Sequence, residues 1–236
     1  MKKETRIIFS ILLVVFLVAG YYYLKNPPQF IRQGRSVKVM QFIRQPEKYQ
    51  EWILPAGSIC KEAPFQFPTD GMVGFLWNDS FRPGHHHTGL DIFSGTEPGV
   101  TPIYAAYDGY LSREANWIST VIIRVPSDPL NPGSQIWTYY THMADPNGNS
   151  LVQPVFPAGT KEVFVKAGTL LGTMGNYSGT AGNPTGVHLH FSIVKDDGQG
   201  HYLSELEIKN TLDPSPYFGM QLDGIKNSST IPVCQP

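Results

Sequence analysis

Residues 185–191 read TGVHLHF, a short run in which apolar and polar side chains alternate. Successive side chains of a β-strand point to opposite faces, so His188 and His190 are expected to project together while their apolar neighbours face a core. The run therefore predicts a strand within 187–195 that buries one face and presents two imidazoles on the other. This strand is the starting point for predicting both the fold and the site.

Turn-forming residues divide the rest of the chain into short segments. The 236 residues include 23 glycines and 20 prolines, and only 16% are charged, which disfavours a helical bundle. No long stretch between residues 64 and 202 shows the period of an amphipathic helix. Five more strands are expected at 101–106, 109–113, 120–125, 136–143 and 161–166. The chain is therefore predicted to be mainly β, with one domain built on a single antiparallel sheet or sandwich.

The amino-terminal residues differ from everything that follows. Basic residues precede an apolar run at 7–24, IIFSILLVVFLVAGYYYL, whose length nearly matches a ~30 Å hydrocarbon core at ~1.5 Å per residue. The run predicts a transmembrane signal anchor within residues 1–25, which makes this a single-pass cell-membrane protein with an extracytoplasmic remainder. A cleaved signal peptide, and hence a secreted protein, is the alternative, although three bulky tyrosines follow the small residues.

Composition divides the remaining chain into three parts. Residues 26–60 contain four prolines in polar sequence and are predicted to form a stalk, with a short amphipathic helix within 36–54. Residues 61–212 form the predicted domain. Residues 213–236 are rich in proline, serine and asparagine and are predicted to be a tail on its surface.

The two cysteines, Cys60 and Cys234, bracket the predicted domain. In an oxidising compartment they would pair and tie the tail to the entrance of the domain. Two unrelated thiols are the alternative. No Cys-x-x-Cys spacing is present, so neither a thiolate zinc site nor a redox motif is expected.

The charge balance excludes one class of function. With 18 basic and 19 acidic residues the net charge is −1, so the chain has no basic field with which to hold nucleic acid. No nucleic-acid partner is expected.

The segment HHHTGLD at 85–91 offers imidazole and carboxylate groups, both of which bind zinc. On a straight strand His87 and Asp91 would lie about 13 Å apart, too far to share an ion. The segment must therefore bend, and Gly89 supplies the backbone freedom for it. A polar loop in which no histidine binds metal is the alternative.

Two further histidine motifs add to this candidate site. The His188/His190 pair shares one face of the predicted strand, and either imidazole could reach an ion there. The segment YYTHM at 139–143 places His142 near the end of another predicted strand. Taken alone, His142 is more typical of an ordinary strand histidine.

Five segments of the chain occur together in a recognisable order, and the resemblance that they carry covers about residues 85–197. They are HTGLD (87–91), PIYAAYDG (102–109), YTHM (140–143), VKAGTLLG (165–172) and TGVHLHF (185–191). In this combination the chain resembles the lysostaphin-type, or LytM-like, zinc metallopeptidases, which cut peptides in bacterial peptidoglycan. The resemblance implies a small antiparallel β-sheet enzyme with its metal in an open groove.

The resemblance also implies roles for individual residues. His87 and Asp91 match the first two zinc ligands of the family, and His190 matches the third. His142 and His188 match its two catalytic histidines that do not bind the metal. The division of roles between these two stays open.

Three other histidines receive no role. His85 and His86 match no position of the motifs and are interpreted as bystanders. His201 lies beyond the motifs.

Three protein ligands leave the fourth position of a tetrahedral zinc ion open, as catalysis requires, and neighbouring imidazoles can move protons. The resemblance thus implies a hydrolase, a zinc metalloendopeptidase with one Zn²⁺ per chain that cuts stem or cross-link peptides of peptidoglycan. We expect a monomer whose partners are this peptide substrate and, through the amino-terminal helix, the membrane. A catalytically inactive module that binds the wall or activates another hydrolase is the alternative.

Several features stay open at this level. The small-residue loop at 176–186 is either a wall of the substrate groove or a mere connector. Phe81 lies where some members of the family carry a tyrosine that assists the oxyanion; if that role is needed, either Tyr139 or Tyr177 replaces it or the activity is low. The peptide bond that is cut, the organism and the wall type cannot be inferred from the residues.

Overall fold

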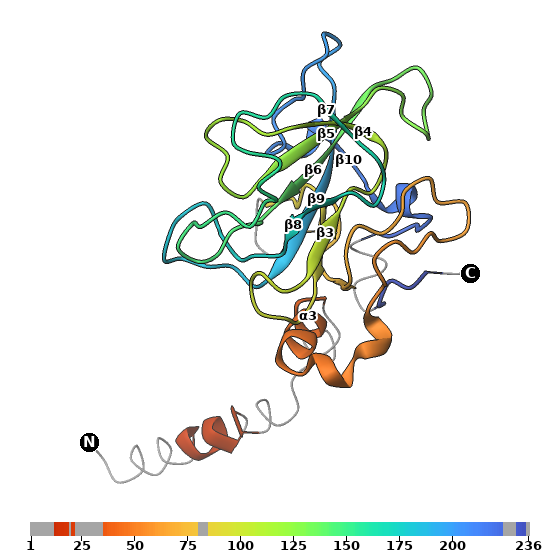
Figure 1. Ribbon diagram of the computed structural model, residues 1–236. Helices are drawn as coiled ribbons and strands as arrows, with labels where there is room; N and C mark the ends of the chain where they lie inside the picture. Colours follow the sequence, from red (N-terminus) through yellow and green to blue (C-terminus); the bar gives the residue numbers. More distant parts are fainter. Residues whose placement is uncertain (1–11, 19, 22–34, 80–84, 224–229, 235–236) are drawn as a thin grey trace.

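The computed structural model describes residues 12–18, 20–21, 35–79, 85–223 and 230–234. Its strands are β1 (Met72–Val73), β2 (Leu90–Phe93), β3 (Pro102–Tyr104), β4 (Gly109–Ser112), β5 (Val121–Val125), β6 (Ile136–Thr141), β7 (Val163–Val165), β8 (Leu170–Thr173), β9 (His188–Lys195) and β10 (Thr211–Leu212). A large antiparallel sheet has the order β1-β2-β9-β6-β5-β4-β7, with β10 also paired to β9 (Figure 1). Strands β3 and β8 form a separate antiparallel pair.

Alternation along the strands decides which side chains enter the core. On β9, Leu189 and Phe191 are fully buried in the main hydrophobic cluster. The neighbouring His188 and His190 therefore project from the opposite face. The β3–β8 pair contributes Ile103 and Leu171 to the same cluster, so it packs on the core face of the large sheet. The polar site is left on the other face.

The six predicted strands are all present, each within two residues of its predicted ends. The mainly β, antiparallel fold is thus confirmed. Strands β1, β2, β8 and β10 were not predicted. Two of them have only two residues, and β2 reads LDIF, in which one polar residue among three apolar ones gives no sustained alternation.

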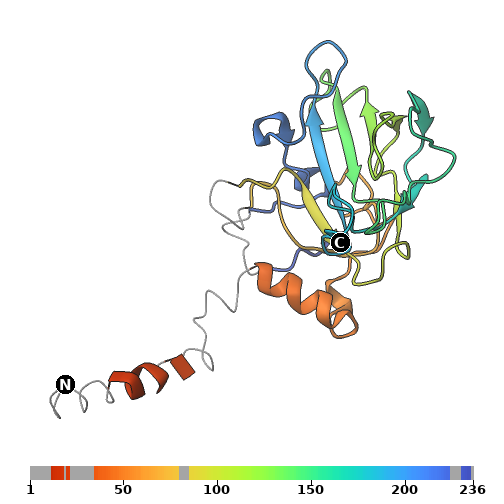
Figure 2. The same ribbon diagram turned by 90° about the vertical axis from the view of Figure 1, so that its left-hand side faces the viewer.

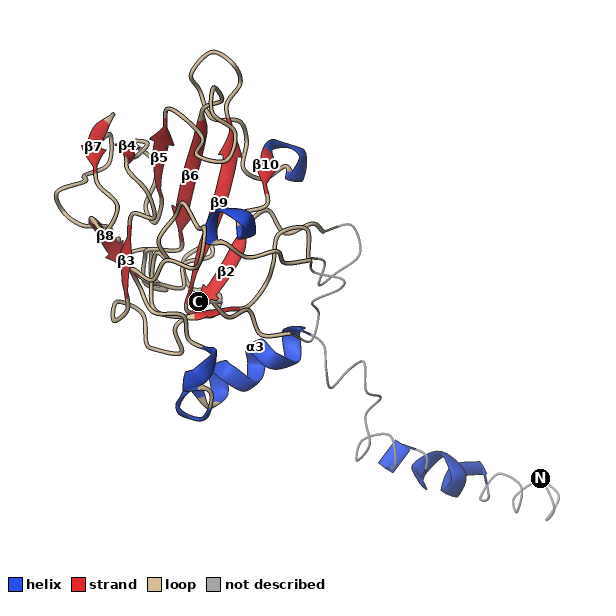
Figure 3. Cartoon of the chain, turned by 90° about the vertical axis from the view of Figure 1, so that its right-hand side faces the viewer, coloured by secondary structure: helices blue, strands red, loops and turns tan. Residues whose placement is uncertain are grey.

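The helix predicted within 36–54 is α3 (Arg35–Arg44), which begins one residue earlier. Its buried side chains Val39 and Phe42 pack against Met72 and Phe93, so the helix covers the end of the sheet where β2 ends (Figures 2 and 3). Short 3₁₀ helices follow at η1 (Pro46–Lys48), η2 (Gln50–Trp52), η3 (Ile208–Asn210) and η4 (Ser215–Phe218).

The predicted membrane anchor, residues 1–25, lies outside the described residues except for 12–18 and 20–21. Those two stretches are helical. Within the described part of the chain, no helix is both long and apolar enough to cross a bilayer.

Residues on both sides of the predicted domain contribute to its core. Leu54 and Cys60 from the predicted stalk, and Tyr217 and Phe218 from the predicted tail, belong to the main hydrophobic cluster. The predicted domain boundaries at residues 60 and 212 stay predictions. The core contacts of these four residues extend across both boundaries. Cys60 and Cys234 form a disulfide in the structure, which agrees with the first of the two alternatives considered for the cysteines.

The disulfide is expected to stabilise the fold because it closes a loop between residues 174 positions apart. Removing a native disulfide commonly costs about 2–5 kcal/mol, mainly because the unfolded chain regains freedom. Replacing both cysteines, Cys60→Ser with Cys234→Ser, should lower the free energy of unfolding by about that amount, as measured by urea denaturation. Equal unfolding midpoints for the variant and for the oxidised parent would contradict this expectation.

Candidate metal centre

The strand register brings two of the candidate ligands together. In the β2–β9 pair, Asp91 lies opposite His190 and Phe93 lies opposite His188. Directly opposed residues of antiparallel strands point to the same face, with their Cβ atoms about 5 Å apart. Asp91 and His190 therefore meet on the polar face of the sheet as neighbours across the ladder.

His87 reaches the same point from the segment that precedes β2. Its Nδ1 lies 2.9 Å from the carbonyl oxygen of Leu76, and its Nε2 lies 2.9 Å from Oδ1 of Asp91. The segment bends as the sequence predicts, but not through a left-handed conformation at Gly89, whose φ is not positive. Gly89 instead provides space, because a Cβ there would lie 2.2 Å from the carbonyl oxygen of Phe191.

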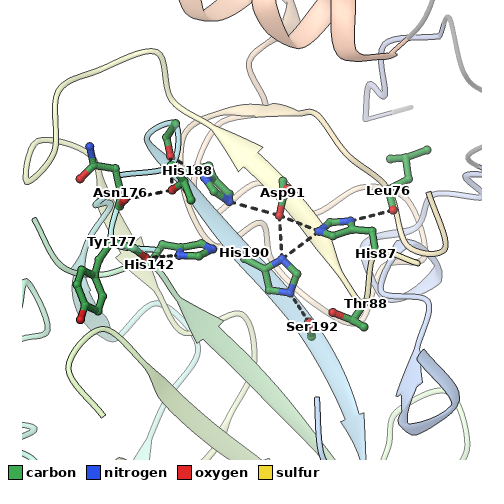
Figure 4. A network of polar contacts seen from close by, with 12 residues as sticks. Leu76, His87, Thr88, Asp91, His142, Asn176, Tyr177, His188, His190 and Ser192 are labelled. Atoms are coloured by element: carbon green, nitrogen blue, oxygen red, sulfur yellow. Dashed lines mark hydrogen bonds and ion pairs between the residues drawn. The ribbon is translucent and has the colours of Figure 1, made fainter. Parts of the chain in front are cut away.

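Three atoms converge in this way (Figure 4). Oδ1 of Asp91 lies 2.9 Å from Nε2 of His87 and 2.8 Å from Nδ1 of His190, and the two nitrogens are 3.0 Å apart. All three residues are buried. Among the described residues, they form the cluster of His, Cys, Asp and Glu side chains whose geometry could hold a metal ion.

The outer nitrogen of each imidazole decides what the inner one can do. A carbonyl oxygen can only accept, so Nδ1 of His87 carries a proton and its Nε2 presents a lone pair. Nε2 of His190 lies 2.9 Å from Oε1 of Glu205, so in the neutral ring that nitrogen carries the proton and Nδ1 presents a lone pair. With Asp91, three acceptors then face one another and repel unless a cation lies among them.

The donor set fits a particular kind of cation. Two imidazole nitrogens and one carboxylate oxygen are a ligand combination typical of catalytic zinc sites. A proton on His190 would satisfy its contact with Asp91 but could not serve all three atoms at once. The residues present therefore fit a zinc ion better than they fit a hydrogen-bonded cluster alone.

His142 and His188 stand beside this cluster, with ring centroids 4.5 Å apart. Nδ1 of His142 donates to the carbonyl oxygen of Tyr177 at 2.6 Å, and Nδ1 of His188 donates to that of Gly186 at 2.7 Å. Both rings therefore turn a lone pair on Nε2 toward the site. Nε2 of His188 lies 3.6 Å from Oδ1 of Asp91.

Burial is the main reason why these two rings stay neutral. Burial, with the nearby His188 and His190, lowers the pKa of His142 to about 3. Burial also lowers the pKa of His188, although Asp91 acts in the opposite direction. A neutral imidazole with a free Nε2 is a proton acceptor at ordinary pH.

In the three-residue cluster, Asp91 and His190 shift each other's pKa in a way that favours the charged form of both. Burial alone would raise the pKa of Asp91, but the imidazoles of His87, His188 and His190 hold it well below its ordinary value. Burial would lower the pKa of His190, but Asp91 and Glu205 raise it to about 10. The carboxylate of Asp91 is therefore ionised and available as a ligand.

His142 has a strained backbone. It directly follows β6 with a φ of 73°, a left-handed conformation that costs a non-glycine residue energy and often marks a functional site. Gly175 packs against this turn: a Cβ there would lie 2.0 Å from the carbonyl oxygen of Ala144 and 2.5 Å from that of His142. The close approach of two loops at Gly175 thus holds His142 in place.

The five side chains open into a groove of about 970 Å³. One wall comes from α3, through Val39, Met40 and Ile43. The loop at 176–186 forms part of the lining through residues such as Tyr177 and Gly179, so it is a wall and not only a connector.

Tyr139 and Tyr177, which the sequence offered as replacements for a missing tyrosine, both line the groove. The hydroxyl of Tyr177 donates to the carbonyl of Gly179 within its own loop. Phe81 lies outside the described residues.

The remaining histidines are peripheral, apart from one. His86 is exposed and contacts Asn78, and His201 is exposed beside Asp197. His85 lines the groove.

Glu205 is the residue at this site that sequence reasoning missed. It belongs to none of the matching segments, and a single glutamate in a loop carries no local signal.

Comparison with known proteins agrees with this geometry. Residues 85–202, half of the chain, match the family model of Peptidase family M23. A search of curated proteins finds no significant match.

Among solved structures, Csd3 of Helicobacter pylori is 19% identical with a TM-score of 0.42, over 68% of this chain and 36% of that one. Lysostaphin of Staphylococcus simulans is 20% identical with a TM-score of 0.41, over 63% of this chain and 49% of that one. Its isolated catalytic domain gives 20% and 0.42, over 63% of this chain and 92% of the domain. The chain thus spans about a third of Csd3 and about half of lysostaphin.

The packing at Gly175 can be tested with a matched pair of substitutions. Gly175→Ala should lower the free energy of unfolding by about 1–3 kcal/mol, because the new methyl group overlaps two carbonyl oxygens. Gly186→Ala is the control, since its Cβ would meet no atom closer than 3.5 Å and the residue is exposed. Urea denaturation of both variants checks this, and equal stability of the two would contradict the close approach.

Proposed function

Because the chain belongs to Peptidase family M23, we propose that it is a zinc-dependent endopeptidase that hydrolyses peptide bonds in the stem or cross-link peptides of peptidoglycan. The observation that carries the proposal is the convergence of His87, Asp91 and His190 beside two neutral imidazoles in one groove. The five segments that resemble lysostaphin-type enzymes support the substrate class.

The proposed ligands are Nε2 of His87, Oδ1 of Asp91 and Nδ1 of His190. Three protein ligands would leave the fourth position of a tetrahedral zinc ion open, as in catalytic zinc sites. When bound there, a zinc ion supplies Lewis acidity, which makes water more acidic and polarises a peptide carbonyl. The surrounding protein keeps Asp91 ionised and holds the His87 ring with Nε2 toward the centre.

The two other histidines are proposed to move the proton. Their Nδ1 atoms are tied to backbone carbonyls, so neither ring can donate from Nε2 until it has accepted a proton there. Nε2 of His142 or His188 accepts the proton of the attacking water and then delivers it to the leaving amine as the C–N bond breaks. The same atom thus serves first as base and then as acid.

The groove accounts for access of the substrate. Its volume of about 970 Å³ suits several residues of an extended peptide. All five proposed site residues come from a single chain, so the proposed enzyme is complete as a monomer.

We propose that residues 1–25 act as a signal anchor that holds the catalytic domain on the outer side of the cell membrane. The apolar run at 7–24 and the Cys60–Cys234 disulfide, which persists in oxidising compartments, support this. A carbonate wash of membranes should leave the chain in the membrane fraction at its full length. Release of a shortened chain into the medium would instead indicate a cleaved signal peptide.

Two variants separate the proposed roles of the histidines. His142→Ala should lower hydrolysis by about 10²–10⁴-fold yet retain one zinc ion, because only a proton acceptor is lost. His190→Ala should lose both zinc and activity, because a ligand is lost. Mass spectrometry of muropeptides after digestion of purified peptidoglycan gives the activity and the bond that is cut, and elemental analysis gives the zinc content.

Full zinc occupancy in the His190→Ala variant would overturn the ligand assignment. A parent protein that is folded but holds no zinc, and that leaves peptidoglycan intact, would favour an inactive module that binds the wall.

A further inference from the structure

Glu205 lies directly behind the third proposed ligand. Its Oε1 is 2.9 Å from Nε2 of His190, and only 12% of its side chain is exposed. It comes from the loop that follows β9 and returns along that strand. No step of the proposed reaction uses it, and it belongs to none of the segments that resemble the family.

The position of Glu205 rules it out as a ligand of the same ion. It contacts Nε2 of His190, whereas the opposite nitrogen of the ring, Nδ1, faces Asp91 and His87. Figure 4 shows that opposite edge of the His190 ring turned toward Asp91 and His87, away from Ser192. Glu205 therefore contacts the His190 ring on the side away from the proposed metal position, and it can affect that position only through His190.

Three donors converge on the same carboxylate oxygen. Besides His190, the hydroxyl of Ser192 donates to Oε1 of Glu205 at 2.8 Å, and the hydroxyl of Thr88 donates to it as well. Thr88 directly follows His87, and Ser192 lies two residues beyond His190. One buried carboxylate thus links the two segments that carry the two histidine ligands.

From this geometry we propose that Glu205 is the positioning residue of the metal centre, holding the His190 ring with its proton on Nε2 and its lone pair on Nδ1. The proposal rests on the proposed function, because it assumes that Nδ1 binds zinc. A carboxylate that only accepts hydrogen bonds leaves a neutral imidazole one tautomer. Partners of this kind orient metal-bound histidines in many proteins, and their loss weakens metal binding.

Ser192 cannot perform this role alone. Its Oγ also lies 2.9 Å from Nε2 of His190, but a hydroxyl can donate as well as accept. Because the hydroxyl of Ser192 donates its hydrogen bond to Glu205, only the lone pairs of its oxygen are left to face Nε2, as an acceptor. Without Glu205, Ser192 is free to donate to Nε2, which places the ring proton on Nδ1 and blocks the proposed ligand atom.

The test compares zinc affinity in the full-length parent, in Glu205→Ala, in the isosteric Glu205→Gln and in a control, Glu207→Gln. Glu207 lies in the same loop, is 51% exposed and pairs with Lys209, so its substitution removes the same charge away from the site. Competition with a chelator should show zinc binding that is about 10- to 100-fold weaker in both Glu205 variants. The control should match the parent.

A second readout separates positioning from a merely structural role. Long-range ¹H–¹⁵N NMR spectra of the zinc-free proteins, recorded at a pH high enough to remove one proton from the His190 ring, report which nitrogen of the neutral ring carries the remaining proton. We expect Nε2–H in the parent and a substantial fraction of Nδ1–H in Glu205→Gln, with urea unfolding of that variant close to that of the parent.

Each outcome bears on a different statement. Parent-like zinc affinity in both Glu205 variants overturns the role of Glu205 and leaves the proposed function intact. Weak binding with the His190 tautomer unchanged also overturns the positioning role. A parent chain that binds no zinc overturns the proposed function and the inference together.

Discussion

Three lone pairs that face one another in a buried pocket are the constraint on which this site depends. Nε2 of His87, Oδ1 of Asp91 and Nδ1 of His190 lie within 3.0 Å of one another, and the outer nitrogen of each ring is already committed to a partner. Such a cluster is stable only if a positive charge lies among the three atoms. The sheet supplies the rigidity that holds them together, since Asp91 and His190 are direct partners in the β2–β9 ladder.

Much of the fold could be predicted because polar and apolar residues alternate in the sequence of strands such as β9. The TGVHLHF run predicted β9 and the outward projection of its two histidines, and both are present. Strand β2 was missed because it reads LDIF, and one polar residue among three apolar ones gives no sustained alternation. The packing of α3 against Met72 and Phe93 also lay beyond prediction, because it depends on residues about 30–55 positions further along the chain.

The candidate site, like the fold, could be predicted in part from the sequence. The motifs, together with the family resemblance they carry, pointed to all five histidine and aspartate residues, and the structure brings these five together. Gly89 was expected to permit a bend and instead permits close packing, a difference that depends on Phe191 across the ladder. The left-handed backbone of His142 and the contact of Glu205 with His190 have no local signal, because each arises between segments that are remote in sequence.

Anomalous diffraction at the zinc absorption edge, from crystals grown with zinc, tests the central claim most directly. The account predicts one strong peak per chain, within about 2.0–2.2 Å of Nε2 of His87, Oδ1 of Asp91 and Nδ1 of His190. It also predicts that His142 and His188 stay unbonded to the metal. The account is contradicted if the density among the three ligands is empty, or if the metal is bound through His142 or His188.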